Sequence, residues 1–82
     1  MFPNPINQQG ELFVNLSDFV GSSADLIIYN GVGQSVQSMR VDKVGERPVM
    51  IKLDDLADGV YSLGVKVLGK RLQARRFIVQ RL

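Results

Sequence analysis

A run of strictly alternating residues in the second half of the chain limits what the chain can fold into. The apolar side chains that share one side of this run are Tyr61, Leu63, Val65 and Val67. A period of two is the signature of a β-strand with one buried face. Asp58-Gly59 before the run and Leu68-Gly69-Lys70 after it are both turn signals. The pattern therefore predicts a central strand with a turn at each end and its Tyr61 face in the core of a small sheet.

Other alternating stretches follow one another at close, regular spacing, and none has the period of an amphipathic helix. We expect further strands at residues 11–16, 24–30, 34–42, 49–53 and 71–80. The stretch 24–30 is apolar on both faces, which predicts an interior position in its sheet. The spacing indicates an all-β fold, a small immunoglobulin-like β-sandwich of six to seven antiparallel strands. A seventh strand would be short and would lie near Pro5 or at residues 17–23.

Two of the expected strands change their apolar side partway along. The change falls between Val36 and Met39 in one strand, and between Leu72 and Phe77 in the last strand. One extra residue in a strand moves all later side chains to the opposite face, which is the effect of a β-bulge. We therefore expect one bulge near Gln37-Ser38 and a second near Arg75-Arg76.

The connecting segments carry signals of their own. Asn30-Gly31-Val32-Gly33 has two glycines in four residues, which predicts a turn with at least one positive φ. We interpret residues 43–48 as a polar hairpin loop and residues 54–59 as a crossing to the central strand. Within that crossing Leu56 is a lone apolar residue, and we expect it to close one end of the core.

The composition places the chain in the class of small folded domains. Its 82 residues suffice for one domain with a thin core, and 45% of them are hydrophobic. The sequence has no Cys, so disulfides and thiolate chemistry are excluded. It also has no His, the commonest general base and zinc ligand. No apolar run is long enough for a membrane-spanning helix, and residues 1–5 lack the features of a secretory signal peptide.

The net charge of +2 is unevenly distributed along the chain. Residues 1–65 contain eight acidic and four basic residues. Residues 66–82 contain no acidic residue, and their cations are Lys66, Lys70, Arg71, Arg75, Arg76 and Arg81. A cationic end attracts an anionic partner. The alternative is a solvated edge strand whose long charged side chains prevent edge-to-edge aggregation.

Catalytic and cofactor motifs are absent from the sequence. The acidic cluster of Asp54, Asp55 and Asp58 lacks the spacing of an EF-hand loop. Three aspartates in a turn can hold a surface calcium ion, but Asp is also a favoured turn residue, and we expect a turn and no metal site. The serines have no His to activate them. Gly31-Val32-Gly33 fits a turn and not a phosphate-binding loop. Aromatic residues in a small β core are usually used for packing, so we expect no nucleic-acid binding. Because the motifs named above are missing, we also expect no cofactor and no enzymatic activity.

Four segments of the chain, taken together, match the pattern of a known family. They are Phe2-Pro3-Asn4-Pro5 with Gly10-Glu11-Leu12, residues 28–36, residues 53–61, and Gly69-Lys70 with Arg75-Arg76-Phe77-Ile78-Val79. In this order and spacing they resemble the type A C-terminal sorting domains of the type IX secretion system, over nearly the whole chain. Two departures are Arg75-Arg76, where Lys pairs are usual, and Gly64, where a larger residue is common.

The resemblance implies a function that composition does not show. Such a domain forms the end of a larger exported protein and directs this N-terminal cargo across the outer membrane. The implied partners are the outer-membrane translocon, a barrel-shaped shuttle protein and a sortase-like peptidase. The implied destination, reached through the periplasm, is the cell surface or the medium.

The resemblance also divides the marked residues into two groups. Those expected to hold the fold are Pro3, Asn4, Pro5, Gly33, Gly59, Tyr61 and Gly69. Those expected to form the recognition signal are Lys70, Arg75, Arg76, Phe77, Ile78, Val79, Arg81 and Leu82. The physical hypothesis is that the basic last strand docks by strand addition or by burying its apolar side chains, while the arginines orient it on an acidic rim.

Two other functions are compatible with a small β-sandwich. One is a structural or adhesive immunoglobulin-like module of a cell-surface protein. The other is a carbohydrate-binding domain, which requires exposed aromatic residues on one face, whereas this chain has six aromatic residues and no Trp. The position of the domain in its parent protein separates the first alternative from a sorting domain, because a sorting domain ends the protein.

Overall fold

The computed structural model describes residues 10–53, 56–72 and 74–80. In chain order the strands are β1 (Glu11–Val14), β2 (Ala24–Tyr29), β3 (Ser35–Val41), β4 (Val49–Lys52), β5 (Gly59–Val67), β6 (Lys70–Arg71) and β7 (Arg75–Val79). A short 3-10 helix, η1 (Ser17–Phe19), connects β1 to β2. These seven antiparallel strands in two sheets confirm the prediction of a small all-β sandwich. The predicted strand at residues 17–23 is wrong, since η1 occupies that segment, and Pro5 lies outside the described residues.

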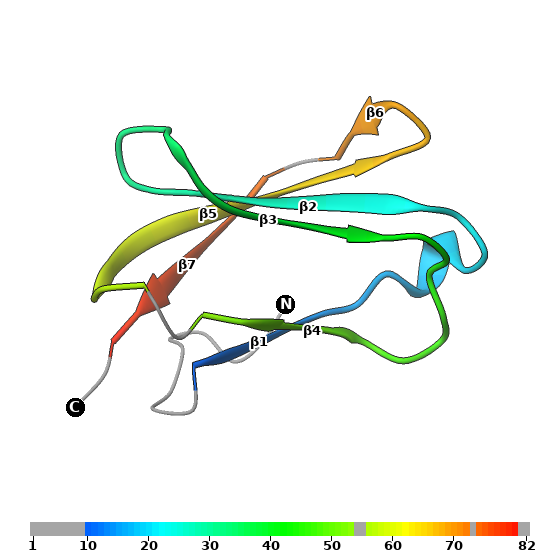
Figure 1. Ribbon diagram of the computed structural model, residues 1–82, viewed down its shortest axis with the longest axis horizontal. Helices are drawn as coiled ribbons and strands as arrows, with labels where there is room; N and C mark the ends of the chain where they lie inside the picture. The colour runs from blue at the N-terminus through cyan, green and yellow to red at the C-terminus, as the bar shows by residue number, and fades with distance from the viewer. Residues whose placement is uncertain (1–9, 54–55, 73, 81–82) are drawn as a thin grey trace.

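The two sheets are unequal in size. β1 and β4 pair to form the smaller sheet, and the larger one has the order β3-β2-β5, with β6 and β7 both on the far side of β5. Figure 1 shows the β1–β4 pair running alongside the larger sheet. β5 and β2 each have neighbours on both sides, which confirms the predicted central and interior strands.

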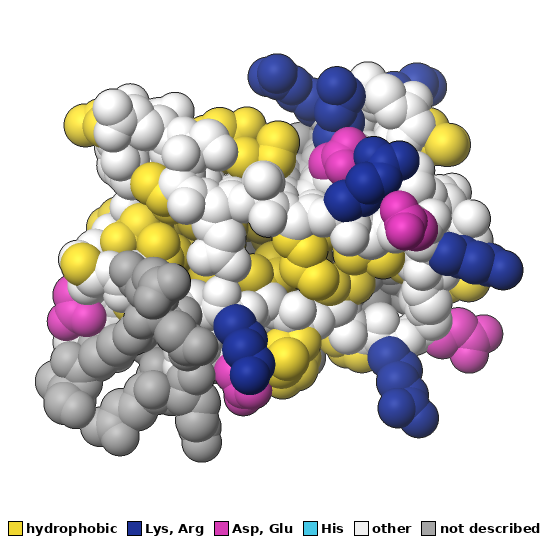
Figure 2. All heavy atoms as spheres, in the orientation of Figure 1, with side chains coloured by type: hydrophobic (Ala, Val, Ile, Leu, Met, Phe, Trp, Pro, Cys, Tyr) yellow, Lys and Arg dark blue, Asp and Glu magenta, His cyan; other side chains and the backbone are white. Residues whose placement is uncertain are grey.

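The core lies between the inner faces of the sheets. On β5 the buried residues are Tyr61, Leu63, Val65 and Val67, as the alternation predicts. They belong to one cluster with Leu12 and Ile51 of the smaller sheet, and Leu56 packs against that cluster as expected. Apolar side chains of this core are visible along the seam between the sheets in Figure 2. Burial of such side chains is the main favourable term that stabilises so small a domain.

The connection from β3 to β4 is not the polar hairpin loop that residues 43–48 indicate, because the two strands belong to different sheets. The segment crosses the end of the sandwich, and Val44 within it is buried. Backbone hydrogen bonds fix this crossing: the amide of Gly21 donates to the carbonyl of Val44 at 2.8 Å, and the amide of Val44 donates to Ser22 at 2.8 Å. Val44 is a lone apolar residue among polar neighbours, which is the signal that predicted the packing of Leu56, but the interpretation of residues 43–48 as a polar hairpin loop overlooked it.

The bulge predicted in the strand at residues 34–42 exists, slightly earlier in the chain than expected, whereas the last expected strand has an interruption and not a continuous bulged strand. Between β2 and β3 the register passes from Ile28↔Gln37 to Tyr29↔Ser35, so Val36 is the extra residue. The last expected strand is interrupted, and its two parts form β6 and β7.

Pairing with β5 locates the interruption. Lys66 pairs with Arg71 in β6, and Leu63 pairs with Arg75 in β7, so three steps along β5 correspond to four along the last strand. The extra residue therefore lies within residues 72–74, just before Arg75-Arg76. Because the interruption divides the last expected strand into β6 and β7, the fold has seven strands among the described residues.

Positive φ angles occur at the predicted turns. In the β2–β3 turn Gly33 has a φ of 86°, and the Asn30 side-chain oxygen accepts hydrogen bonds from the amides of Val32 and Gln34 at 3.1 and 2.9 Å. The two-residue turn between β5 and β6 has Leu68 at 53° and Gly69 at 78°. Two consecutive positive φ angles define a type I′ turn, whose twist matches that of the flanking strands.

We predict that β7 contributes to stability through alternate residues only. Phe77 is fully buried and stacks on Tyr61 with ring centroids 5.8 Å apart, whereas Ile78 is 43% exposed. Phe77→Ala should lower the free energy of unfolding by about 3–5 kcal/mol. Ile78→Ala should change it by less than about 1 kcal/mol. Urea denaturation measures both, and equal losses would contradict the assignment of the two faces.

Candidate recognition surface

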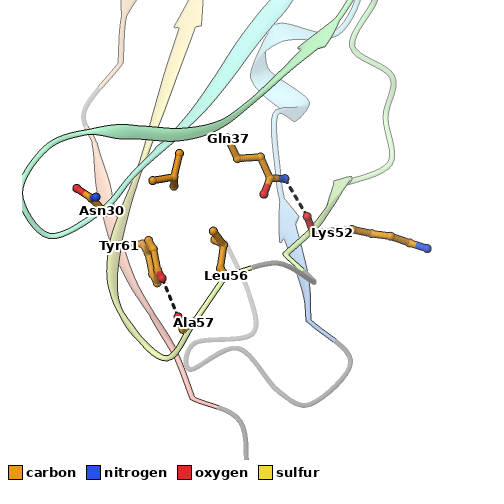
Figure 3. Close-up of a pocket in the computed structure, with 7 residues that line it drawn as sticks. Asn30, Gln37, Lys52, Leu56, Ala57 and Tyr61 are labelled. Carbon is orange, nitrogen blue, oxygen red and sulfur yellow. Dashed lines mark hydrogen bonds between the residues drawn. The ribbon is translucent and has the colours of Figure 1, made fainter.

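A hollow at one end of the sandwich has both polar and apolar side chains in its lining. It measures about 530 Å³ and is lined by Asn30, Val36, Gln37, Lys52, Leu56, Ala57 and Tyr61. Figure 3 shows its two hydrogen bonds: the Tyr61 hydroxyl donates to the Ala57 carbonyl at 2.7 Å, and the Gln37 amide donates to the Lys52 carbonyl at 2.8 Å. Among the residues that the structure describes, the lining includes no carboxylate and no activated nucleophile. The polar groups therefore tie β3 to β4 and the start of β5 to the segment before it.

The part of the chain that the structure describes contains neither a cluster of metal-ligating side chains nor a membrane-spanning helix. No group of three acidic, His or Cys side chains is placed there to hold a metal ion. The hypothesis of a cation at Asp54, Asp55 and Asp58 involves two residues outside that part. No described helix has the length and apolar character to span a bilayer.

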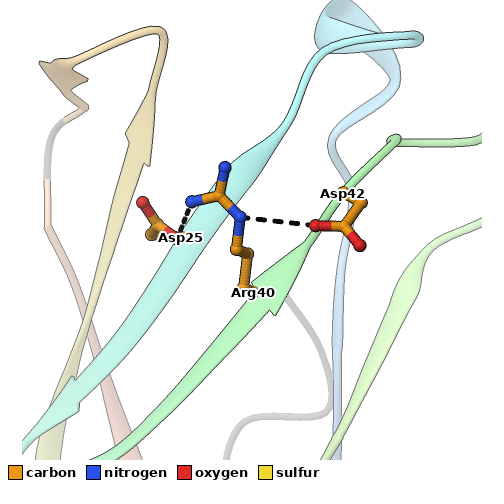
Figure 4. A network of polar contacts seen from close by, with 3 residues as sticks. All are labelled: Asp25, Arg40 and Asp42. Carbon is orange, nitrogen blue, oxygen red and sulfur yellow. Dashed lines mark hydrogen bonds and ion pairs between the residues drawn. The ribbon is translucent and has the colours of Figure 1, made fainter.

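The charges on the β2–β3 part of the larger sheet are paired. Arg40 of β3 lies between Asp25 and Asp42, with N–O distances of 3.1 and 3.3 Å, as Figure 4 shows. All three side chains are substantially exposed, so these ion pairs contribute little to stability. They do neutralise the cation of this region.

The cations on β5, β6 and β7 have no ion-pair partner among the residues that the structure describes. They are Lys66, Lys70, Arg71, Arg75 and Arg76, and all five residues are exposed. None of their side chains makes an ion pair or hydrogen bond with another residue for which the structure gives a position. Figure 2 shows Lys and Arg side chains gathered around β6 at the upper edge of the molecule. We call this set the cationic surface.

β7 divides the expected signal residues between its two faces. Phe77 and Val79 lie in the core, where a partner cannot contact them without unfolding the domain. Arg76 pairs with Ser62 and Ile78 pairs with Val60, and antiparallel partners share a face. Arg76 and Ile78 therefore lie on the outer face of the sheet, where a partner can reach them.

Arg75 points to the opposite side of β7 from Arg76. It pairs with the buried Leu63, so it lies on the inner side of the sheet at its edge. There it lines a hollow of about 380 Å³ with Asp18, Phe19 and Leu72, among others. Two arginines that are adjacent in sequence thus present positive charge on both sides of the same strand.

The other expected residues have structural positions or lie outside the described ranges. Gly33 and Gly69 have the positive φ that their turns require. Gly59 does not, and a Cβ there would make an ordinary contact of 3.7 Å with the Tyr61 ring. Pro3, Asn4, Pro5, Arg81 and Leu82 fall outside the described residues.

Gly64 has a role that sequence reasoning missed. A Cβ at this position would lie 3.1 Å from Cε2 of Tyr29, because the tyrosine ring covers the neighbouring strand. The register places Gly64 opposite Ile27, two residues along the strands from the pair of Tyr29 with Ser62 and therefore on the same face. The small residue thus makes room for a large one on the outer face. The signal that could have indicated this packing is a bulky residue, Tyr29, on one strand and a glycine, Gly64, on the facing strand.

We predict that the cations of β7 are dispensable for folding. Arg75→Gln and Arg76→Gln should each change the free energy of unfolding by less than about 0.5 kcal/mol, because neither side chain has a described partner to lose. Chemical denaturation of each variant checks this. A loss of about 2 kcal/mol in either variant would show that the arginine is part of the structure.

Comparison with known proteins gives one finding. The model of the family described as secretion system C-terminal sorting domain matches residues 1–80. No curated protein and no solved structure matches the chain.

Proposed function

The chain belongs to the family of secretion system C-terminal sorting domains, and we propose that the secretion machinery recognises it through the cationic surface of β5, β6 and β7. The domain is a non-catalytic sorting signal for export across the outer membrane by the type IX secretion system, to the cell surface or the medium. It interacts with the secretion machinery. This membership favours the sorting function over the adhesive-module alternative.

The single observation that carries the proposal is the set of unpaired cations. An exposed, solvated cation adds almost no desolvation penalty to the folded domain, and an anionic partner can contact it directly. Five of them lie on three adjacent strands, while the cation of β3 is neutralised by two carboxylates. Such a concentration of one sign of charge raises the association rate with an acidic surface and orients the encounter.

The contact itself combines charge with a small apolar area. On the outer face Arg76 lies beside the Val60–Ile78 pair, in which both side chains are about half exposed. An acidic rim on the partner would engage Arg76, and burial of the apolar pair would slow dissociation. Phe77 and Val79 contribute from within, because their packing holds β7 against β5.

The finer assignment of partners is part of the same proposal. The domain forms the carboxyl end of a larger exported protein, whose N-terminal part is the cargo. The partners are the outer-membrane translocon, a barrel-shaped shuttle protein and a sortase-like peptidase that removes the domain. The family resemblance supports this order of events, and the exposed cations supply a physical means of recognition that leaves the fold intact.

The test removes charge without disturbing the core. A reporter carrying this chain at its carboxyl end is expressed in a type IX-secreting bacterium, with Arg75→Gln/Arg76→Gln in one strain. Loss of two charge-assisted contacts should reduce secretion by about ten-fold. The matched control is Lys43→Gln/Arg47→Gln, which removes the same charge from the exposed β3–β4 connection and should secrete normally.

Deleting residues 77–82 is a weaker test, because it removes Phe77 and Val79 from the core and unfolds the domain. The double substitution avoids this problem. Normal secretion of a stably folded Arg75→Gln/Arg76→Gln variant would exclude the cationic surface as the signal. An equal loss in the control would show that only net charge matters.

A further inference from the structure

The turn between β5 and β6 contains the one non-glycine residue with a positive φ in the described part of the chain, Leu68 at 53°. A side chain with a Cβ crowds the following carbonyl oxygen in this conformation. Type I′ turns therefore strongly favour Asn, Asp or Gly at both central positions. Gly69 fits this rule and Leu68 does not. The chain keeps a leucine where a smaller or more tolerant residue would fold more easily.

Leu68 gains nothing from the fold in exchange for this strain. Its side chain is 77% exposed and belongs to neither the core cluster nor the residues packed against it. A Cβ added at the adjacent Gly69 would meet no atom within 4 Å, so the tip of the turn is open. An apolar side chain held outward at an energetic cost indicates a use outside the domain.

The surroundings of the tip are cationic. Val67 pairs with Lys70, and Lys66 pairs with Arg71, so three cations flank the turn within two residue pairs. The β2–β3 turn provides a contrast within the same molecule. Val32 at its tip is 80% exposed, but it lacks a positive φ, and no Lys or Arg lies between residues 30 and 39.

We propose that Leu68 is an anchor that inserts into an apolar pocket with a carboxylate rim on a protein partner. Lys66, Lys70 and Arg71 would engage that rim while the leucine fills the pocket. The two-residue turn fixes the leucine in one orientation, and such preorganisation lowers the entropy cost of entering a shaped pocket. This inference rests on the proposed function only in taking the partner from the secretion machinery.

A lipid surface is a poorer match for the same features. One leucine buries far fewer methylene groups than a myristoyl chain, which alone gives only marginal membrane binding. A fluid bilayer also gains little from a rigid turn that fixes a single side chain. The geometry therefore favours a pocket of defined shape.

The experiment replaces Leu68 with Asn in the complete 82-residue chain, alone and on the secreted reporter. Relief of the strain should raise the folding equilibrium constant by about five-fold. Loss of the buried leucine should reduce secretion by about ten-fold. Leu68→Met keeps the apolar volume, so this reporter should be secreted at nearly the level of the unchanged chain. Val32→Asn removes an equally exposed apolar tip and should also secrete normally.

Each outcome supports or overturns the proposal. A Leu68→Asn variant that is more stable and normally secreted would overturn it, since the leucine would then have no external use. Equal losses for Leu68→Asn and Val32→Asn would also overturn it. Sedimentation with phosphatidylglycerol vesicles that requires Leu68 would assign the tip to a membrane instead. If the reporter with Arg75→Gln/Arg76→Gln is secreted normally while the reporter with Leu68→Asn is not, recognition through β7 is excluded. The proposal for Leu68 is then still supported.

Discussion

The hydrogen bonding of β5 on both of its edges is the constraint on which the rest of the structure depends. β2 occupies one edge over most of its length, and β6 and β7 share the other. Because β5 alternates strictly, its inner face fills the core while its outer face carries Val60, Ser62, Gly64 and Lys66. In each strand that pairs with β5, the residues opposite its inner face also point toward the core, and the residues opposite its outer face also point outward. β7, as the last strand, thereby buries Phe77 and exposes Arg76 and Ile78.

Periodicity therefore accounts for much of the fold. The alternation of residues 61–67 predicted the central strand and its buried face, and the doubly apolar run of β2 predicted an interior strand. The two glycines of residues 30–33 predicted a positive φ, which Gly33 has, and the signal at residues 68–70 predicted the turn that follows β5. In each case a local pattern determines a local structure, so no knowledge of distant contacts is needed.

Other features depend on distant contacts, and the sequence did not predict them. The burial of Val44 results from the crossing between sheets, which leaves no periodic trace. The candidate site was predicted only in outline for a related reason. Moving the register by one residue within 72–74 exchanges the two faces of everything that follows. Arg75 and Arg76 looked equivalent in the sequence, yet one lies at the edge of the core and the other on the outer face.

These features give a physical account of how a small inert domain can serve as an export signal. The core residues of β7 determine whether the domain is folded, and the exposed residues of the same strand are available to a partner. In the proposed account, stability and recognition share β7 but use alternate side chains. In the same proposal, the strained Leu68 at the neighbouring turn adds an apolar contact at a small cost in stability.

The most direct measurement of this account is site-specific photo-crosslinking in secreting cells. A photoreactive residue is placed at position 76 on the outer face of β7 or, for comparison, at position 47 in the β3–β4 connection, which is equally exposed. The account predicts a crosslink from position 76 to a component of the secretion machinery and little or none from position 47. Crosslinks of equal yield from both positions, or from position 47 alone, would contradict it.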